Sequence, residues 1–123
     1  RYIRPDMCVC GGLTAGKKIA AEAEMRGIYV IPHNPLGPIS TAACLQLDAV
    51  IPNFEIQEYP MGNDGCRLDC EMKEPFHLEN GYIHVPEGPG LGVELIDDID
   101  TVFPFQGSYG GINLHEDGSI VDR

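Results

Sequence analysis

The chain has 123 residues, and its 19 Asp and Glu residues against 8 Lys and Arg give a formal net charge of −11 at pH 7. This charge excludes nucleic acid and anionic membrane surfaces as partners, because both would repel it. No apolar run approaches the roughly 18 residues of a transmembrane helix and no signal peptide is visible, so we expect a cytoplasmic location. The sequence opens directly on an apparent strand, and we expect it to be the C-terminal part of a larger protein.

The first predicted helix covers residues 14–26 and is rich in Ala, Lys and Glu. Thr14 is the expected N-cap, and Gly27 is the expected C-terminal stop. Glu22 is expected to pair with Arg26, one helical turn further on. The residues expected to face a sheet are Ile19, Ala20, Ala23 and Met25.

The second predicted helix covers residues 39–50 and follows a loop with two prolines, Pro35 and Pro38. Proline disfavours helix before itself and favours it just after, so the helix should begin beside Pro38. Small residues at its start would let it approach a sheet closely. Its expected buried stripe comprises Ile39, Ala42, Ala43, Leu47, Val50 and Ile51.

Three strands are predicted around these helices, over residues 1–5, 28–31 and 53–59. The run 28–31 is too continuous for a half-exposed strand and too short for a helix, which predicts a strand buried on both faces of a parallel sheet. A strand, a helix and a second strand in succession are typical of a parallel β/α array.

Polar side chains follow each predicted strand: Asp6 the first, His33 the second and Glu58 the third. Successive members lie 27 and 25 positions apart, which is close to one β/α unit. A single such residue is more often a turn residue or a helix cap, but three at matching positions predict a shared rim where chemistry occurs. In the third strand, alternation puts Glu58 on one face and Glu55 on the other, so the pattern does not choose between these acids.

After Pro60 the sequence becomes more polar and loses a clear hydrophobic period. Residues 78–85 predict two short strands around the turn Asn80-Gly81. Residues 97–100 form an acidic run expected on the surface, and residues 115–121 predict one more turn between extended segments. Three further histidines, expected to be structural, are His77, His84 and His115.

Five cysteines lack the paired spacing of a zinc site and are expected to be reduced thiols: Cys8, Cys10, Cys44, Cys66 and Cys70. Cys44 falls within the second predicted helix. We therefore expect it in the core.

Several segments together resemble the C-terminal third of the enolase superfamily, in its mandelate racemase group, and within that group the dehydratases of D-galactonate and related sugar acids. The segments are Gly11-Gly12-Leu13-Thr14, Pro32-His33-Asn34-Pro35-Leu36-Gly37-Pro38, Ala42-Ala43-Cys44-Leu45, Ile56-Gln57-Glu58 and the run from Pro86 to Glu94. The resemblance implies an α/β fold, a (β/α)7β barrel with a separate α+β capping domain. Residues 1–60 would be the last β/α units, and residues 61–123 would return to pack on the barrel and the capping domain.

The resemblance also implies an activity, the Mg2+-dependent dehydration of a sugar acid to a 2-keto-3-deoxy acid through an enediolate. It makes His33 an acid that protonates the departing hydroxyl, with Asp6 as its partner. Glu58, if protonated, would donate a hydrogen bond to the enediolate. His33, Glu58 and Asn34 would bind substrate, whereas the carboxylates that bind the metal are expected upstream of Arg1.

Two other functions remain open. A racemase or epimerase of the same superfamily would use His33 to return a proton to the α carbon, and a noncatalytic scaffold would keep only the barrel. The expected partners are a small-molecule sugar acid, the remainder of the same enzyme and further copies of it in a homo-oligomer.

Overall fold

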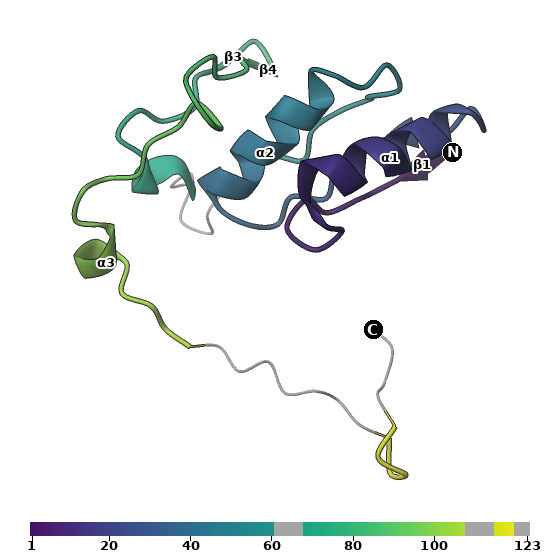
Figure 1. The fold of residues 1–123 in the computed structure, drawn as a ribbon. Coiled ribbons are helices and arrows are strands. Elements are labelled where there is room, and N and C mark those ends of the chain that lie inside the picture. Colours follow the sequence, from purple (N-terminus) through teal and green to yellow (C-terminus); the bar gives the residue numbers. More distant parts are fainter. Residues whose placement is uncertain (61–67, 108–114, 120–123) are drawn as a thin grey trace.

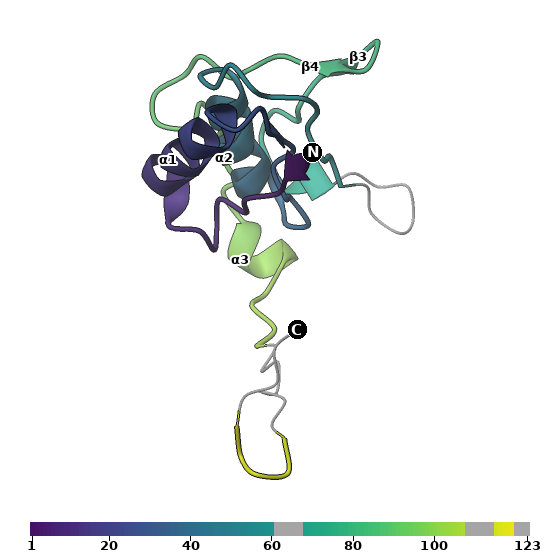
Figure 2. The same cartoon turned by 90° about the vertical axis from the view of Figure 1, so that its right-hand side faces the viewer.

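The computed structural model describes residues 1–60, 68–107 and 115–119. Two helices, α1 (Gly12–Glu24) and α2 (Pro38–Asp48), lie side by side, and β1 (Tyr2–Ile3) runs beneath α1 (Figures 1 and 2). Among the helices of these three ranges, none is both long and apolar enough to cross a membrane.

The strands pair in parallel, as the sequence predicts. In the ladder between β1 and β2 (Tyr29–Val30), Tyr2 lies opposite Tyr29. The assigned strands are shorter than predicted because Pro5 has no N–H to donate to the second strand and Pro32 has none to donate to the third extended segment. Pairing resumes one residue later, where Asp6 forms a parallel bridge with His33. The backbone N–H of His33 donates to the carbonyl oxygen of Pro5 at 3.0 Å.

The third predicted strand is reduced to one bridge, between Val30 and Phe54. Val30 donates to the oxygen of Asn53 and accepts from the N–H of Glu55. The next bond in this ladder would need an N–H from Pro32, so regular pairing stops there. The order of the three extended segments is still the predicted one, with β2 in the middle.

The prediction that β2 is buried on both faces is wrong. Val30 is fully buried against the helices, whereas the neighbouring Tyr29 is 48% exposed and stacks at an angle on Tyr2. Because strand side chains alternate, one face meets α1 and α2 while the other stays open. The core cluster on the covered face comprises Met7, Ala20, Ala23, Val30, Cys44, Leu47 and Ile51.

Helix α1 begins two residues before the predicted N-cap. Gly11 has a left-handed backbone (φ 105°) and turns the chain so that Gly12 is already helical, so Thr14 caps nothing. The predicted stop is confirmed, since Gly27 has φ 62° and its N–H donates to Glu24. The side chain of Met25, predicted to face the sheet, is 84% exposed because the helix ends at Glu24.

The other details of α1 agree better with the sequence. The pair between Glu22 and Arg26 is present, and Ala20 and Ala23 are buried. Ile19, by contrast, is exposed at the edge of the helix.

Helix α2 begins at Pro38, which occupies its first turn. Ala42, Leu47 and the adjoining Ile51 are buried as predicted, and Cys44 lies in the core as predicted. Ile39 and Val50 are exposed, against the prediction, because Ser40, Thr41 and Leu45 occupy the buried face instead. Small side chains at the start of the helix thus let it lie close to the strands.

The later part of the chain contains short elements: η1 (Leu68–Glu71), β3 (Leu78–Glu79), β4 (Tyr82–Ile83) and α3 (Ile99–Val102). The predicted hairpin is confirmed, with positive φ at both Asn80 and Gly81. The acids of the 97–100 run are exposed as predicted, although α3 within it is not predicted.

The turn predicted in the tail is confirmed over residues 115–119, where the N–H of His115 donates to Ser119. The flanking residues Ile120 and Val121 lie outside the described ranges. So do Cys66 and the start of the irregular segment, residues 61–67. Cys8, Cys10 and Cys44 are free thiols.

Candidate functional site

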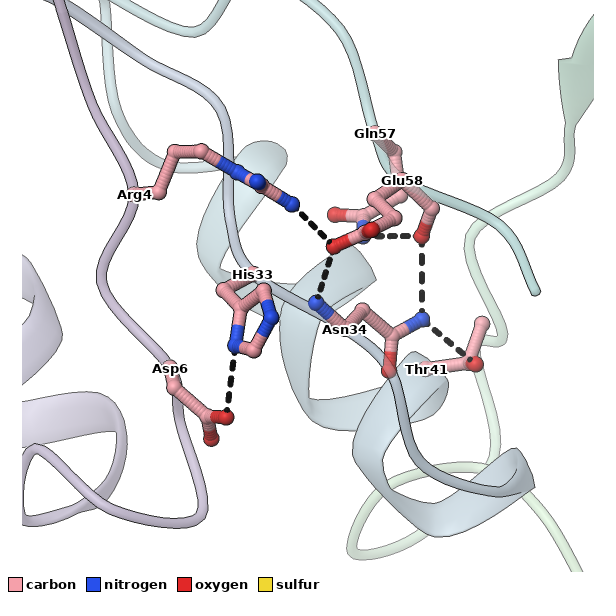
Figure 3. A network of polar contacts seen from close by, with 7 residues as sticks. All are labelled: Arg4, Asp6, His33, Asn34, Thr41, Gln57 and Glu58. Atoms are coloured by element: carbon pink, nitrogen blue, oxygen red, sulfur yellow. Dashed lines mark hydrogen bonds and ion pairs between the residues drawn. The ribbon is translucent and has the colours of Figure 1, made fainter. Parts of the chain in front are cut away.

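The ladder between the first two strands brings Asp6 and His33 together. Their backbones pair, and His33 Nδ1 lies 3.0 Å from Asp6 Oδ2 (Figure 3). Both side chains project from the open face of the strands, opposite the core cluster, so the imidazole is only half-buried. The predicted pairing of the two strand ends is therefore present as a direct contact.

The carboxylate of Asp6 is held from its other side by the turn that follows it. Its Oδ1 accepts the backbone N–H of Cys8 at 2.8 Å, and its carbonyl oxygen accepts those of Val9 and Cys10. Oδ2 is thereby aimed at the imidazole. A proton on His33 Nδ1 would donate to it, which leaves Nε2 as the atom that exchanges protons with a ligand.

The structure also distinguishes the two acids of the third segment. Glu55 is exposed, whereas the carboxylate of Glu58 points toward the residues that follow β1 and β2. Its Oε2 accepts two hydrogen bonds, from Arg4 Nη2 at 2.6 Å and from the backbone N–H of Asn34 at 2.8 Å. Figure 3 shows Arg4 extending from the first strand segment to make this contact.

Asn34 positions Glu58 rather than facing outward. Its side chain is fully buried, and Nδ2 donates to Thr41 Oγ1 at 2.8 Å and to the carbonyl oxygen of Glu58 at 3.0 Å. Thr41 lies in the first turns of α2, so these bonds tie the site to that helix. These contacts occupy the Asn34 amide nitrogen, and the prediction that Asn34 binds substrate stays a prediction.

The same contacts set the charge of Glu58. The backbone N–H of Asn34 lowers the pKa of this carboxyl most. Burial opposes this as the second-largest effect, and Arg4 lowers the pKa further by its hydrogen bond and its charge. A hydrogen bond from Glu58 to an enediolate needs the protonated form. In this arrangement the anion is favoured, and the role of Glu58 as a donor to the enediolate, when protonated or sharing a proton, stays a prediction.

Sequence reasoning missed Arg4 and Thr41. Arg4 precedes Asp6 by two residues, and strand alternation would have placed both on one face, so the signal was present. No pattern indicates the bond between Asn34 and Thr41, because the intervening loop determines where the two meet. Among the described residues, His77, His84 and His115 make no recorded contact with Asp6, His33 or Glu58.

The described residues do not fit a magnesium site. They contain no group of three or more His, Cys, Asp or Glu side chains that could hold a metal ion. The two carboxylates of the site are already committed, Asp6 to His33 and Glu58 to Arg4. Mg2+ requires several oxygen ligands in near-octahedral geometry, so we assign no metal ligand among residues 1–60, 68–107 and 115–119.

Cavities of about 500 Å³ lie elsewhere. One is lined by Met72 to His77 together with His84, Pro86, Glu87 and Gly92 to Glu94. Another lies between the end of α2, Phe54 to Gln57 with Tyr59, and the β3–β4 hairpin. Neither is lined by Asp6, His33 or Glu58, whose face of the strands is open.

Comparison with known proteins agrees with this geometry. Residues 1–99 match the family model of the enolase C-terminal domain-like proteins, and the chain belongs to that family. It is 41% identical over 128 residues to the D-galactonate dehydratase of Cronobacter sakazakii, and 44% identical over 102 residues to that of Xanthomonas campestris. The first alignment covers 98% of this chain, the second 79%.

Solved structures give the same result. An enolase from Pantoea ananatis with bound D-gluconate and Mg superposes with a TM-score of 0.74 at 36% identity, over 87% of this chain and 26% of the other. An enolase from Agrobacterium radiobacter with bound Na and L-malate gives 0.75 at 30% identity, over 97% and 33%. The predicted resemblance to the enolase superfamily, and to D-galactonate dehydratase within it, is confirmed. The chain spans about a third of the length of the curated relatives it matches.

Proposed function

We propose that this chain is the C-terminal part of an enzyme that dehydrates a sugar acid to a 2-keto-3-deoxy acid. The observation that carries the proposal is the Asp6–His33 pair at neighbouring strand ends, in a chain about 40% identical to D-galactonate dehydratases. Residues 1–60 would supply the last β/α units of a barrel, and residues 61–123 would pack on the barrel and a capping domain. The site would then face the barrel's open end.

The reaction needs a proton removed from C2 and a hydroxyl lost from C3. We assign the first step to a base outside this chain. His33 would donate its own Nε2 proton to the C3 hydroxyl, which leaves as water. At the same time the electron pair of the enediolate forms the C2–C3 double bond. The resulting enol then becomes the 2-keto acid. Asp6, held by the turn after β1, stabilises the imidazolium that donates the proton.

We also propose that Mg2+ is bound by residues outside this chain, since one solved relative carries that ion. The proton transfer from His33 is argued independently of the metal. We expect the protein to act in the cytoplasm and to form a homo-oligomer.

The test uses the complete protein with D-galactonate and D-gluconate, and NMR to follow both the product and the exchange of the C2 proton with D2O. His33→Asn is expected to lower dehydration by about 100-fold or more, the usual loss when a general acid is removed. Slow exchange at C2 should persist, because the base that removes that proton is retained. His77→Asn, a matched change at an exposed histidine, should leave both rates unchanged.

Normal dehydration by His33→Asn would refute this role for His33. Formation of a C2 epimer in place of a keto acid would favour the racemase or epimerase alternative. If the complete protein neither converts an aldonate nor exchanges its C2 proton, the result would favour the noncatalytic alternative.

A further inference from the structure

The proton transfer proposed for His33 does not require Arg4, although Arg4 is a charged residue of the same site. Its guanidinium extends from the first strand segment to Glu58, on the same side of the strands as His33 (Figure 3). One N–H group is committed to Glu58 Oε2 at 2.6 Å, whereas the side chain remains 50% exposed. A guanidinium has five N–H donors in a planar fork, so most of the recognition capacity of Arg4 is unused.

The charges around Arg4 make this capacity significant. The network drawn in Figure 3 contains two carboxylates, Asp6 and Glu58, and Arg4 is its only permanently charged cation. A sugar acid is itself an anion and would be repelled by these carboxylates. Arg4 is the group of the network that can offset this repulsion and bind a carboxylate with two parallel hydrogen bonds.

We propose that Arg4 is a substrate-binding residue that moves from Glu58 to the carboxylate of the incoming acid, so that binding releases Glu58 to take up a proton. The inference rests on the proposed function in that the ligand is the acid substrate. In the proposed two-bond contact the ligand carboxylate uses the Nη2 group that now donates to Glu58, so the two carboxylates compete for that group. Once Arg4 has moved, Glu58 keeps the backbone N–H of Asn34 but loses its nearest cation.

This transfer reconciles the observed geometry with the chemistry expected of Glu58. The groups that face the Glu58 carboxylate are Arg4 from the first strand segment and His33 and Asn34 from the second. With Arg4 in place, Glu58 is an anion and only accepts hydrogen bonds. With Arg4 on the ligand, a protonated Glu58 can donate one to an oxyanion. The proton arrives from solvent, and no bond to carbon changes.

The test is calorimetric binding of 3-deoxy-D-gluconate, which has no C3 hydroxyl to lose, to the complete protein. Titration at about pH 6 in two buffers of different ionisation enthalpy measures proton uptake. The wild type should take up protons on binding. Arg4→Gln should bind at least about 10-fold more weakly, because it loses a charged, two-bond contact at a half-exposed site, and should take up fewer protons. Glu58→Gln should abolish the uptake through this group.

Two further variants complete the experiment. Arg26→Gln removes another arginine paired with a glutamate, on the exposed face of α1, and should match the wild type in affinity and uptake. Arg4→Lys keeps the charge without the fork and should bind with intermediate affinity. It also serves if Arg4→Gln fails to fold.

Unchanged affinity and unchanged uptake in Arg4→Gln, or in Arg4→Lys if only that variant folds, would overturn the proposal. So would failure of the analogue to bind the wild type. Calorimetry needs no turnover, so it tests the role of Arg4 separately from the reaction. If binding and proton uptake depend on Arg4 but no product forms, the proposed dehydration is refuted and the role of Arg4 stands. If Arg4→Gln dehydrates normally and binds the analogue like the wild type, the role of Arg4 is refuted and the proposed dehydration stands.

Discussion

The polar residues of the site are positioned mainly by backbone hydrogen bonds. Asp6 is aimed by the N–H of Cys8, and Glu58 by the N–H of Asn34. Such donors are fixed by the fold and do not lose side-chain entropy when they bind. Only Arg4 reaches its partner through a long, half-exposed side chain, which makes it the adaptable member of the group.

Asp6 and His33 should act as one unit. Asp6→Asn keeps an oxygen for the N–H of Cys8, so the turn should persist, but it removes the charge that stabilises the imidazolium. We expect Asp6→Asn and His33→Asn each to lower dehydration by about 100-fold or more, and the double variant to be little worse than either. Turnover of the three variants in the complete protein measures this. Fully additive losses would show that the two residues act separately.

At the scale of elements, α2 carries an acid at an unfavourable place. Asp48 ends the helix with both carboxylate oxygens buried and without a hydrogen-bond partner among the described residues. Burial raises the pKa of this carboxyl to about 7. The folded state therefore holds a proton that the unfolded state has released between about pH 4 and 7, and stability should fall as pH rises through that range.

Asp48→Asn removes this dependence and should stabilise the complete protein more at pH 8 than at pH 4, by roughly 1–3 kcal/mol or more, because the buried, unpaired carboxylate is charged only at the higher pH. Urea denaturation at the two pH values measures the difference. Asp100→Asn, at an exposed position, is the control and should show no such dependence. Equal effects of Asp48→Asn at both pH values would mean that another part of the protein pairs with Asp48.

The sequence predicted the order and type of the main elements because the apolar run 28–31, the glycine stop at Gly27 and the Asn80-Gly81 turn are local signals. It misplaced boundaries where one residue overrides a pattern, as Gly11 does at the start of α1 and Pro32 does in the ladder. The spacing pointed to Asp6 and His33, whereas strand alternation left Glu58 and Glu55 open and only the family resemblance chose Glu58. The sequence did not indicate the Arg4–Glu58 pair, because 54 residues separate the two and only the fold brings them together.

At the scale of the whole molecule, the described chain covers only one face of its strands. Tyr2 and Tyr29 are exposed large apolar side chains on the open face. Burying one such side chain stabilises a fold by about 1.5–3 kcal/mol, so the open face represents a large part of the stability of a small domain.

The 123-residue chain expressed alone should therefore lack a cooperative thermal transition and should expose apolar surface and strand edges. Circular dichroism and binding of a hydrophobic dye measure these properties, with the complete protein as the control. A sharp two-state transition of the monomeric chain would contradict the prediction.

The parallel bridge between Asp6 and His33 has a consequence for evolution. The backbone bonds that align these two positions do not depend on which side chains they carry, and Pro5 and Pro32 keep the preceding ladder short on both strands. Replacing the acid or the imidazole would leave the frame in place and change only the chemistry presented at the rim. A lineage can therefore exchange one reaction for another at these two positions while inheriting the same strands, helices and core.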